Sequence, residues 1–240
     1  MDIIISGYGR MGKEVGKICL NRNHNIIATI DKTNDWRLLA SINYSKAVVI
    51  DFSLPNEATN NFIRCFELGL PIVTGTTGWY DNFDFMVEQC NKHKGSFFYA
   101  PNFSIGVNLF FKANSYLAKL MYGFNNYSVQ INETHHIHKI DEPSGTAIAI
   151  AEGIIDKYKN LDSWSLNKQI SNTSLPIFSF REGEVTGSHE VVYESNEDLL
   201  SLTHEAKNRS GFAHGAVLAA EFIVGKKGVF NMNDLLNQML

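Results

Sequence analysis

Residues 3–12 read Ile-Ile-Ile-Ser-Gly-Tyr-Gly-Arg-Met-Gly, and this stretch indicates the fold of the first part of the chain. The three isoleucines form a short apolar run, which is typical of a strand buried on both faces. Three glycines follow in the spacing Gly-x-Gly-x-x-Gly. After them, apolar residues recur with the spacing of one helix face, at Met11, Val15 and Ile18. The stretch therefore predicts a strand, a glycine turn and a helix in direct succession.

An acidic residue at the end of the next predicted strand supports a dinucleotide-binding turn. Residues 26–30 form that strand, and Asp31 stands 19 residues after Gly12. In Rossmann folds the glycines let the backbone approach the pyrophosphate, and such an acid accepts a hydrogen bond from the ribose. The alternative is a tight strand-to-helix turn beside a surface aspartate. We favour cofactor binding, with the candidates Gly7, Tyr8, Gly9, Arg10, Met11, Gly12, Asp31 and Lys32.

Strands and helices continue to alternate up to about residue 100. Further strands are predicted at 47–52, 71–74 and 97–99, with helices at about 56–68 and 79–93. This rhythm predicts a Rossmann-type, doubly wound parallel sheet of the α/β class. Such sheets bind ligands outside the carboxyl ends of their strands, although the residues found there are also common turn formers. The cofactor-binding candidates in these loops are Phe52, Ser53, Gly75, Thr76, Thr77, Ala100, Pro101, Asn102 and Phe103.

Beyond residue 103 the pattern changes to α+β. Helices are predicted at about 106–122, 146–159, 213–225 and 233–240, and strands at 127–134, 177–182, 189–194 and 199–205. A polar linker follows the second of these helices, and the last helical segment is expected to return to the first domain. We therefore predict a dinucleotide-binding domain of residues 1–103 and 214–240, and a substrate domain of residues 104–213.

Residues 133–147 read Glu-Thr-His-His-Ile-His-Lys-Ile-Asp-Glu-Pro-Ser-Gly-Thr-Ala. This segment predicts a site of substrate binding and catalysis. Histidine has an ordinary pKa near neutrality, so a group of histidines suits proton transfer. Lys139 beside a helix that starts at Ser144-Gly145-Thr146 suits a carboxylate or phosphate, because free backbone N–H groups and the helix dipole favour an anion. The segment predicts a site that holds an anionic substrate and gives it a proton.

Two other interpretations of the histidines remain open. His136 and His138 alternate as strand residues do, but no second group of residues has a recognisable zinc spacing, so we assign no metal. A single histidine is most often a structural residue, and His138 fits that description best within the segment. His189, His204 and His214 are individually uninformative.

Composition excludes several classes of protein. The chain has 240 residues, of which 44% are hydrophobic and 19% charged, and this balance is typical of a globular protein. A net charge of −4 offers no general surface for nucleic acid. Three scattered cysteines favour reduced thiols, and no apolar stretch approaches the ~20 residues that span a bilayer. Because the chain also enters its first strand without a signal-peptide pattern, we expect a soluble, cytoplasmic protein without a membrane partner.

The whole chain resembles the dihydrodipicolinate reductase family, also called 4-hydroxy-tetrahydrodipicolinate reductases. The segment 133–147 carries the strongest part of this resemblance. The other matching motifs are Gly-Arg-Met-Gly at 9–12, Asp51-Phe52-Ser53 with Pro55, Gly75-Thr76-Thr77-Gly78, Asn102-Phe103-Ser104 with Gly106-Val107-Asn108, Arg181-x-Gly183, Gly187-x-His189, Leu202-Thr203-His204, and Phe212-Ala213 with Gly215-Ala216.

The resemblance implies a function and assigns roles to residues. It implies reduction of 4-hydroxy-tetrahydrodipicolinate, a cyclic imine dicarboxylate, to tetrahydrodipicolinate in lysine and diaminopimelate synthesis, with NADH or NADPH as cofactor. It also implies that the substrate domain has an open mixed sheet that assembles a homotetramer. By motif, His135 resembles the proton donor and Lys139 its catalytic partner and a substrate ligand. The remaining substrate-binding candidates are His136, Ser144, Gly145 and Thr146.

The chain departs from the family pattern in three places. The region around 32–46 is short, and the turn Gly7-Tyr8-Gly9-Arg10 is one residue tighter than in relatives with an extra glycine. Leu54 stands where many relatives have a basic residue, so the choice between NADH and NADPH stays open. A different Rossmann reductase, a non-catalytic dinucleotide sensor and a zinc protein are the competing classes.

Overall fold

The computed structural model describes residues 1–239, apart from the side chains of residues 33 and 34. The chain forms two compact units. The first contains residues 1–105 together with the segment from Arg209 onward, and the second contains residues 106–208.

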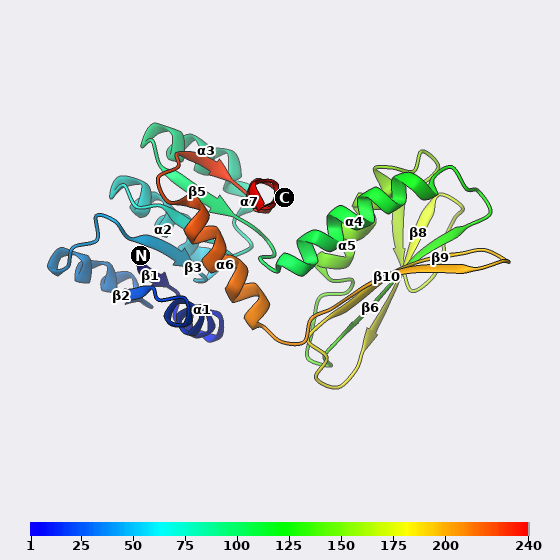
Figure 1. The fold of residues 1–240 in the computed structure, drawn as a ribbon, viewed down its shortest axis with the longest axis horizontal. Helices are drawn as coiled ribbons and strands as arrows, with labels where there is room; N and C mark the ends of the chain where they lie inside the picture. Colours follow the sequence, from blue (N-terminus) through cyan, green and yellow to red (C-terminus); the bar gives the residue numbers. More distant parts are fainter. Residues whose placement is uncertain (240) are drawn as a thin grey trace. The chain divides into compact units, whose positions relative to one another are not determined.

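A six-stranded parallel sheet forms the centre of the first unit (Figure 1). Its strands, in spatial order, are β11 (Gly228–Phe230), β5 (Ser96–Tyr99), β4 (Ile72–Thr74), β3 (Val48–Asp51), β1 (Asp2–Ser6) and β2 (Asn25–Ile30). The three isoleucines of β1 are all apolar because both faces of the strand are buried. Ile3 and Ile5 pack into the core on one face of the sheet, and Ile4 packs into the core on the other. The strand order reverses between β1 and β3, the switch point at which doubly wound sheets bind ligands.

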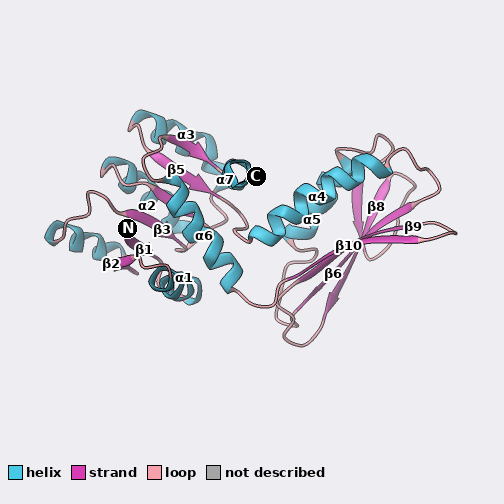
Figure 2. Ribbon diagram, viewed as in Figure 1, coloured by secondary structure: helices cyan, strands magenta, loops and turns pink. Residues whose placement is uncertain are grey.

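Helices cover both faces of this sheet (Figure 2) and complete a core on each side. Helices α1 (Arg10–Asn21) and α6 (Ser210–Ile223) contribute to the core that contains Ile3, and α7 (Met232–Met239) adds to it. Helices α2 (Pro55–Glu67) and α3 (Phe83–Lys92) contribute to the opposite core with the 3₁₀ segment η1 (Thr33–Ser41). A second 3₁₀ turn, η2 (Tyr80–Asn82), leads into α3.

The second unit has a mixed five-stranded sheet. Its strands, in spatial order, are β10 (Leu199–Glu205), β9 (Ser188–Glu194), β6 (Ser128–His135), β8 (Ser174–Arg181) and β7 (Ser163–Leu166). The β10–β9 and β9–β6 pairs are antiparallel, whereas β6–β8 and β8–β7 are parallel. Helices α4 (Ile105–Met121) and α5 (Gly145–Ile155) pack apolar residues against Ile131, Ile177 and Val191 of the sheet.

The predicted fold class is confirmed, with differences in detail. The structure adds η1, β7 and β11, which the sequence pattern did not predict, and α5 ends at Ile155 rather than at 159. The compact units divide at 208/209, five residues before the boundary expected at 213/214, because α6 begins at Ser210 and its Ala213 is a core residue of the first unit. The last predicted helix extends to 240, and that residue lies outside the described part. No helix within residues 1–239 is long and apolar enough to cross a membrane.

Candidate active site

The glycine turn after β1 has the sterics of a nucleotide-binding turn. A Cβ added to Gly7 would lie 2.3 Å from the carbonyl oxygen of Phe52, and one added to Gly12 would lie 2.1 Å from the carbonyl oxygen of Gly7. By contrast, a Cβ on Gly9 would meet nothing within 4 Å. The N-cap residue of α1 is Gly9, which has no side chain that could cap the helix. The turn therefore leaves an open approach to a helix N-terminus, which is what a pyrophosphate needs.

Asp31 lies beside this turn at the end of β2. Its Oδ1 accepts a hydrogen bond from the backbone N–H of Tyr8 at 3.1 Å. Asp35 holds the following loop, because its Oδ2 accepts from the backbone N–H groups of Asp31 (3.0 Å) and Lys32 (2.8 Å). Those two bonds and the nearby Lys32 side chain lower the pKa of Asp35. Asp31 and Lys32 are both exposed.

Two cavities adjoin the turn. The first has a volume of about 360 Å³ and lies between the ends of β1, β2 and β3, with Gly7, Gly9, Asp31, Lys32, Phe52 and Ser53 in its wall. It is also lined by Ser6, Ile30, Trp36, Leu54, Glu57 and Asn61, which the sequence analysis did not assign to the cofactor. The second, of about 280 Å³, is lined by Gly9, Arg10, Met11, Phe52, Ser53, Pro55, Gly75, Thr76 and Thr77. Tyr8 and Gly12 line neither cavity.

The predicted loop 100–103 differs from the other loops. None of its four residues lines either cavity, and Ala100 and Phe103 are 2% exposed core residues. Phe103 packs on Phe98 and Phe52, with ring centroids 5.8 and 6.1 Å apart. Phe103 thus supports the Phe52 loop by packing, whereas Pro101 is exposed.

A buried carboxylate joins the carboxyl ends of three strands. Asp51, fully buried at the end of β3, accepts hydrogen bonds from Ser6 of β1 (2.8 Å), Thr74 of β4 (3.0 Å) and Thr76 (2.8 Å). Burial raises the pKa of Asp51, and these hydroxyl groups act in the opposite direction. The carboxylate thereby fixes the loops that form the second cavity.

In the second unit, strand register builds a polar cluster around β6. Glu133 and His135 are two positions apart on this strand, so both side chains project from the same face. Glu133 is paired with His189 of β9 and Ser179 of β8, and His135 with Arg181 of β8. Cross-strand partners share a face, so Ser179, Arg181 and His189, which are distant in sequence, meet Glu133 and His135 there.

Glu133 is the centre of the cluster. It is 1% exposed, and its carboxylate accepts hydrogen bonds from the Ser179 hydroxyl (2.6 Å) and from the backbone N–H of Ser144 (3.0 and 3.2 Å to the two oxygens). Burial by itself acts to raise the pKa of Glu133, but His189, Ser144 and Ser179 outweigh it and lower the pKa to about 2. The group is therefore an ionised carboxylate inside the protein.

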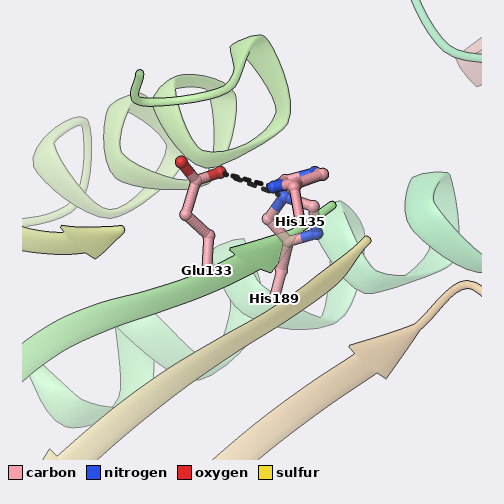
Figure 3. A group of neighbouring side chains, drawn as sticks. All are labelled: Glu133, His135 and His189. Carbon is pink, nitrogen blue, oxygen red and sulfur yellow. Dashed lines mark ion pairs between the residues drawn. The ribbon is translucent and has the colours of Figure 1, made fainter. Parts of the chain in front are cut away.

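Two imidazoles face this carboxylate (Figure 3). The Nδ1 atom of His135 lies 3.5 Å and the Nε2 atom of His189 lies 3.6 Å from Oε2 of Glu133. His135 is 7% exposed, and its pKa is lowered to about 4, first by burial and then by the neighbouring His189, with Glu133 acting in the opposite direction. His135 is therefore neutral near pH 7 in the unliganded protein.

Lys139 is held close to the cluster by the loop after β6. Its Nζ contacts both carboxylate oxygens of Asp141 at 2.8 Å. Arg181 fastens this loop to β8, because its guanidinium donates to the carbonyl oxygens of Lys139 (3.3 Å) and Asp141 (2.7 Å) and to the Ser179 hydroxyl (2.8 Å). An anionic ligand of Lys139 therefore has to compete with Asp141.

The start of α5 lies beside this cluster, and its N-cap residue Ser144 makes hydrogen bonds there. Ser144 is 2% exposed and caps the helix, since its Oγ accepts from the backbone N–H of Ala147 at 3.1 Å and contacts Nε2 of His189 at 3.1 Å. Gly145 is exposed and Thr146 is partly exposed. His136 is partly buried, with its ring centroid 6.2 Å from that of the exposed His138.

The comparisons with known proteins agree with both halves of the chain. The family description "Dihydrodipicolinate reductase, N-terminus" matches residues 1–103, and "Dihydrodipicolinate reductase, C-terminus" matches residues 106–236. A protein of Christiangramia forsetii named 4-hydroxy-tetrahydrodipicolinate reductase is 44% identical over 239 residues, which cover 100% of this chain and 99% of that one. The chain belongs to the dihydrodipicolinate reductase family.

Other relatives extend this result. A Lawsonia intracellularis protein named 4-hydroxy-tetrahydrodipicolinate reductase is 31% identical, with 98% of each chain covered. Among solved structures, a dipicolinate-bound dihydrodipicolinate reductase from Paenisporosarcina sp. TG-14 aligns with a TM-score of 0.74 at 23% identity, over 96% of this chain and 97% of that chain. That likeness bears on the fold, which is the dihydrodipicolinate reductase fold in both units.

Some residues of this reductase-family site could not be assigned from sequence. Glu133 lies in the segment 133–147, but its position there indicates no role, and His189 is uninformative by itself. Arg181 and Ser179 are more than 40 residues from Glu133 in sequence, so only the β6–β8 register brings them together. The signal that could have found Arg181 and His189 is their place in the family motifs.

The same cluster also has ligand atoms for a metal, in a combination that no sequence spacing indicates. Glu133, His135 and His189 each offer one ligand atom, and these three atoms lie within 4.8 Å of one another. We favour the hydrogen-bonded interpretation, because the Glu133 oxygens accept bonds from Ser144 and Ser179, and Nε2 of His189 contacts the Ser144 hydroxyl. His136 and His138 are not members of this group.

Proposed function

We propose that the chain catalyses the NAD(P)H-dependent reduction of 4-hydroxy-tetrahydrodipicolinate to tetrahydrodipicolinate in lysine and diaminopimelate biosynthesis. The observation that carries this proposal is that one chain has a nucleotide-type glycine turn in its first unit and an imidazole cluster beside a lysine and a helix N-terminus in its second. The relatives with full-length similarity bear the name of this activity.

The first unit is proposed to hold the cofactor. The open approach at Gly9 and the uncapped start of α1 suit the pyrophosphate, and Asp31 suits the ribose hydroxyls. The walls formed by Phe52, Ser53 and residues 75–77 continue this surface. NADH or NADPH, when bound there, supplies a hydride to the substrate.

The second unit is proposed to bind the two carboxylates and deliver the proton. Lys139 releases Asp141 and binds one substrate carboxylate in its place. The backbone N–H groups at Gly145 and Thr146 suit the other substrate carboxylate. His136 adds a polar wall to this cradle. Ser144 contributes as the helix cap, because its backbone N–H and hydroxyl are already bonded.

His135 is the proposed proton donor. The 4-hydroxyl group leaves as water, which gives the conjugated imine. Hydride addition to this imine leaves an electron pair on carbon or nitrogen, and a proton forms the second new bond there. Because His135 is neutral near pH 7 in the unliganded protein, it has to gain its proton as the dianionic substrate binds. General acid help of this kind is worth roughly 10²–10⁴ in rate.

We also propose that the chain is a cytoplasmic homotetramer that assembles through its second sheet. β10 is an edge strand, and it exposes Leu199 (57%) and Leu200 (40%), while Phe180 on β8 is 53% exposed. Exposed apolar side chains at an open sheet edge favour pairing with another copy. Cys19, Cys65 and Cys90 are free buried thiols, which fits a reducing compartment.

The proposed activity is tested by following NADH oxidation with freshly generated 4-hydroxy-tetrahydrodipicolinate, with and without a chelator. We expect substrate-dependent oxidation that the chelator leaves unchanged. Binding of NADH without turnover would indicate a dinucleotide sensor instead. Activity lost with chelator and regained with zinc would indicate a metal-dependent protein.

A further inference from the structure

Glu133 is a buried charge that the proposed reaction does not yet use. Its side chain is fully covered, and it lies on β6 two residues before the proposed proton donor. Removing a carboxylate from water is costly, so a protein retains one inside only when other groups compensate it. The question is what the charge does for the two imidazoles that face it.

The two oxygens of Glu133 have different side-chain neighbours. Oε1 accepts from the Ser179 hydroxyl at 2.6 Å and lies 3.8 Å from the guanidinium of Arg181. Oε2 is the oxygen that both imidazoles approach, at 3.5 Å for His135 and 3.6 Å for His189 (Figure 3). The Nδ1 atom of His135 is buried and has no hydrogen-bond partner within the described residues. Oε2 can therefore accept a hydrogen bond from Nδ1–H of His135 after a shift of a few tenths of an ångström.

We propose that Glu133 is a positioning residue that sets the protonation of His135: it directs Nδ1–H toward the carboxylate, leaves Nε2 for the substrate, and stabilises the imidazolium that forms when the substrate binds. The proposal deepens the proposed function and rests on it. Carboxylates commonly orient an imidazole in this way, through the nitrogen that does not react.

Charges from every neighbouring element bear on His135. Glu133 faces it from its own strand, His189 from β9, Arg181 from β8, and Lys139 with Asp141 from the following loop. Of the two carboxylates near His135, Asp141 is exposed and is paired with Lys139, whereas Glu133 is buried. Glu133 is thus the buried anion that opposes the cationic neighbours.

Substrate binding changes this balance in one direction. The low pKa of His135 shows that burial and its neighbours favour the neutral ring before substrate arrives. Two substrate carboxylates add negative charge beside it and favour the imidazolium. Without Glu133, the ring would face the cations with no buried anion, and the proton would be held less well.

The same carboxylate holds the substrate cradle. Both of its oxygens accept from the backbone N–H of Ser144, the residue that caps α5. Moving Glu133 would therefore also disturb the cradle, so the test has to separate charge from support. Ser179→Ala provides the matched control, because it removes a hydrogen bond to the same carboxylate and leaves the charge in place.

The test measures proton uptake when dipicolinate binds, by titration calorimetry near pH 7 in buffers of different ionisation enthalpy. Wild-type protein is expected to take up close to one proton per site, Glu133→Gln markedly less, and Ser179→Ala as much as wild type. In turnover, Glu133→Gln should lower kcat about 10²-fold and shift the pH at which kcat falls to a more acidic value. NADH affinity, measured by fluorescence, should change less than about twofold, because the cofactor residues belong to the other unit.

The possible failures are distinguishable. The Glu133 proposal is overturned if wild-type protein reduces the substrate yet binds dipicolinate without taking up a proton, a measurement that depends on no variant folding. It is also overturned if Glu133→Gln and Ser179→Ala lower kcat equally with unchanged pH profiles, which would leave Glu133 a purely structural role. If wild-type protein binds NADH but neither dipicolinate nor substrate, the proposed function itself fails, and the role of Glu133 fails with it.

Discussion

At the scale of single residues, the substrate-side cluster makes stability depend on pH. The pKa of His135 is lowered from 6.5 to about 4 by burial and by His189, so the unfolded chain binds more protons between these values. Stability is therefore lost as the pH falls from about 6.5 to about 4. The pKa of Glu133 is lowered from 4.5 to about 2, so the protein loses further stability as the pH falls below about 4.5.

We predict that the urea midpoint of unfolding falls between pH 7 and pH 5, and that it falls less in His135→Gln. The reason is that glutamine has no proton to gain in the unfolded state. His204, whose pKa is also lowered by burial, keeps part of the dependence in the variant. Equal falls for wild type and variant would show that His135 does not carry the effect.

Asp31 and Lys32 make a second residue-scale prediction, on cofactor choice. The exposed Asp31 carboxylate would repel a 2′-phosphate, at a cost of about 1–4 kcal/mol for charges ~4 Å apart, whereas Lys32 would attract it. Leu54 in the same cavity adds no charge, and Glu57 adds a further carboxylate. We predict that kcat/KM at low salt is at least as high with NADH as with NADPH. A tenfold preference for NADPH would contradict this, and Lys32→Ala would then test whether Lys32 is responsible.

At the scale of elements, α6 offers a matched pair of glycines. A Cβ on Gly215 would come within 1.8 Å of the carbonyl oxygen of Phe103, whereas a Cβ on Gly211 would meet nothing within 4 Å. Gly215→Ala should destabilise the first unit by about 1–3 kcal/mol or more, since the backbone has to move. Gly211→Ala should be neutral or stabilise by up to about 1 kcal/mol. Chemical unfolding of both variants checks this, and equal effects would mean that α6 does not pack closely on Phe103.

Elements differ in how well their sequences predict them. The strand β1 and the turn at Gly7 were predictable, because both faces of the strand are buried and the glycines have steric causes. The edge strands β7 and β11 have only four and three residues, too few for an alternating pattern to stand out. The segment η1 falls in the short region after Lys32, where the resemblance predicted a trimmed loop.

The site shows the same division. His135, Lys139 and the start of α5 lie within one segment, so the sequence alone predicts that they form one site. The partners of Glu133 could not, because Ser179 and His189 reach it only through strand register, which depends on the whole sheet. Ala100 and Phe103 show the converse, since a loop at the right edge of the sheet contains buried packing residues.

At the scale of the whole molecule, the exposed residues of β10 predict assembly. We expect the wild-type mass in light scattering to be that of four copies of the 27.0 kDa chain. Leu200→Glu should give smaller species, because it puts a charge at the proposed interface. Leu20→Glu is the control, a leucine that is 62% exposed on α1 of the first unit. A wild-type monomer, or an unchanged tetramer in Leu200→Glu, would contradict this interface.

The central claim is that this chain is a reductase in which His135 donates a proton to the substrate. The kcat of His135→Gln with 4-hydroxy-tetrahydrodipicolinate and NADH tests this claim most directly. NADH affinity is measured in parallel, since the cofactor residues lie in the other unit. We predict that kcat falls at least ~10²-fold while NADH affinity stays within about twofold of wild type. A variant that keeps more than about a tenth of the wild-type kcat would contradict the account.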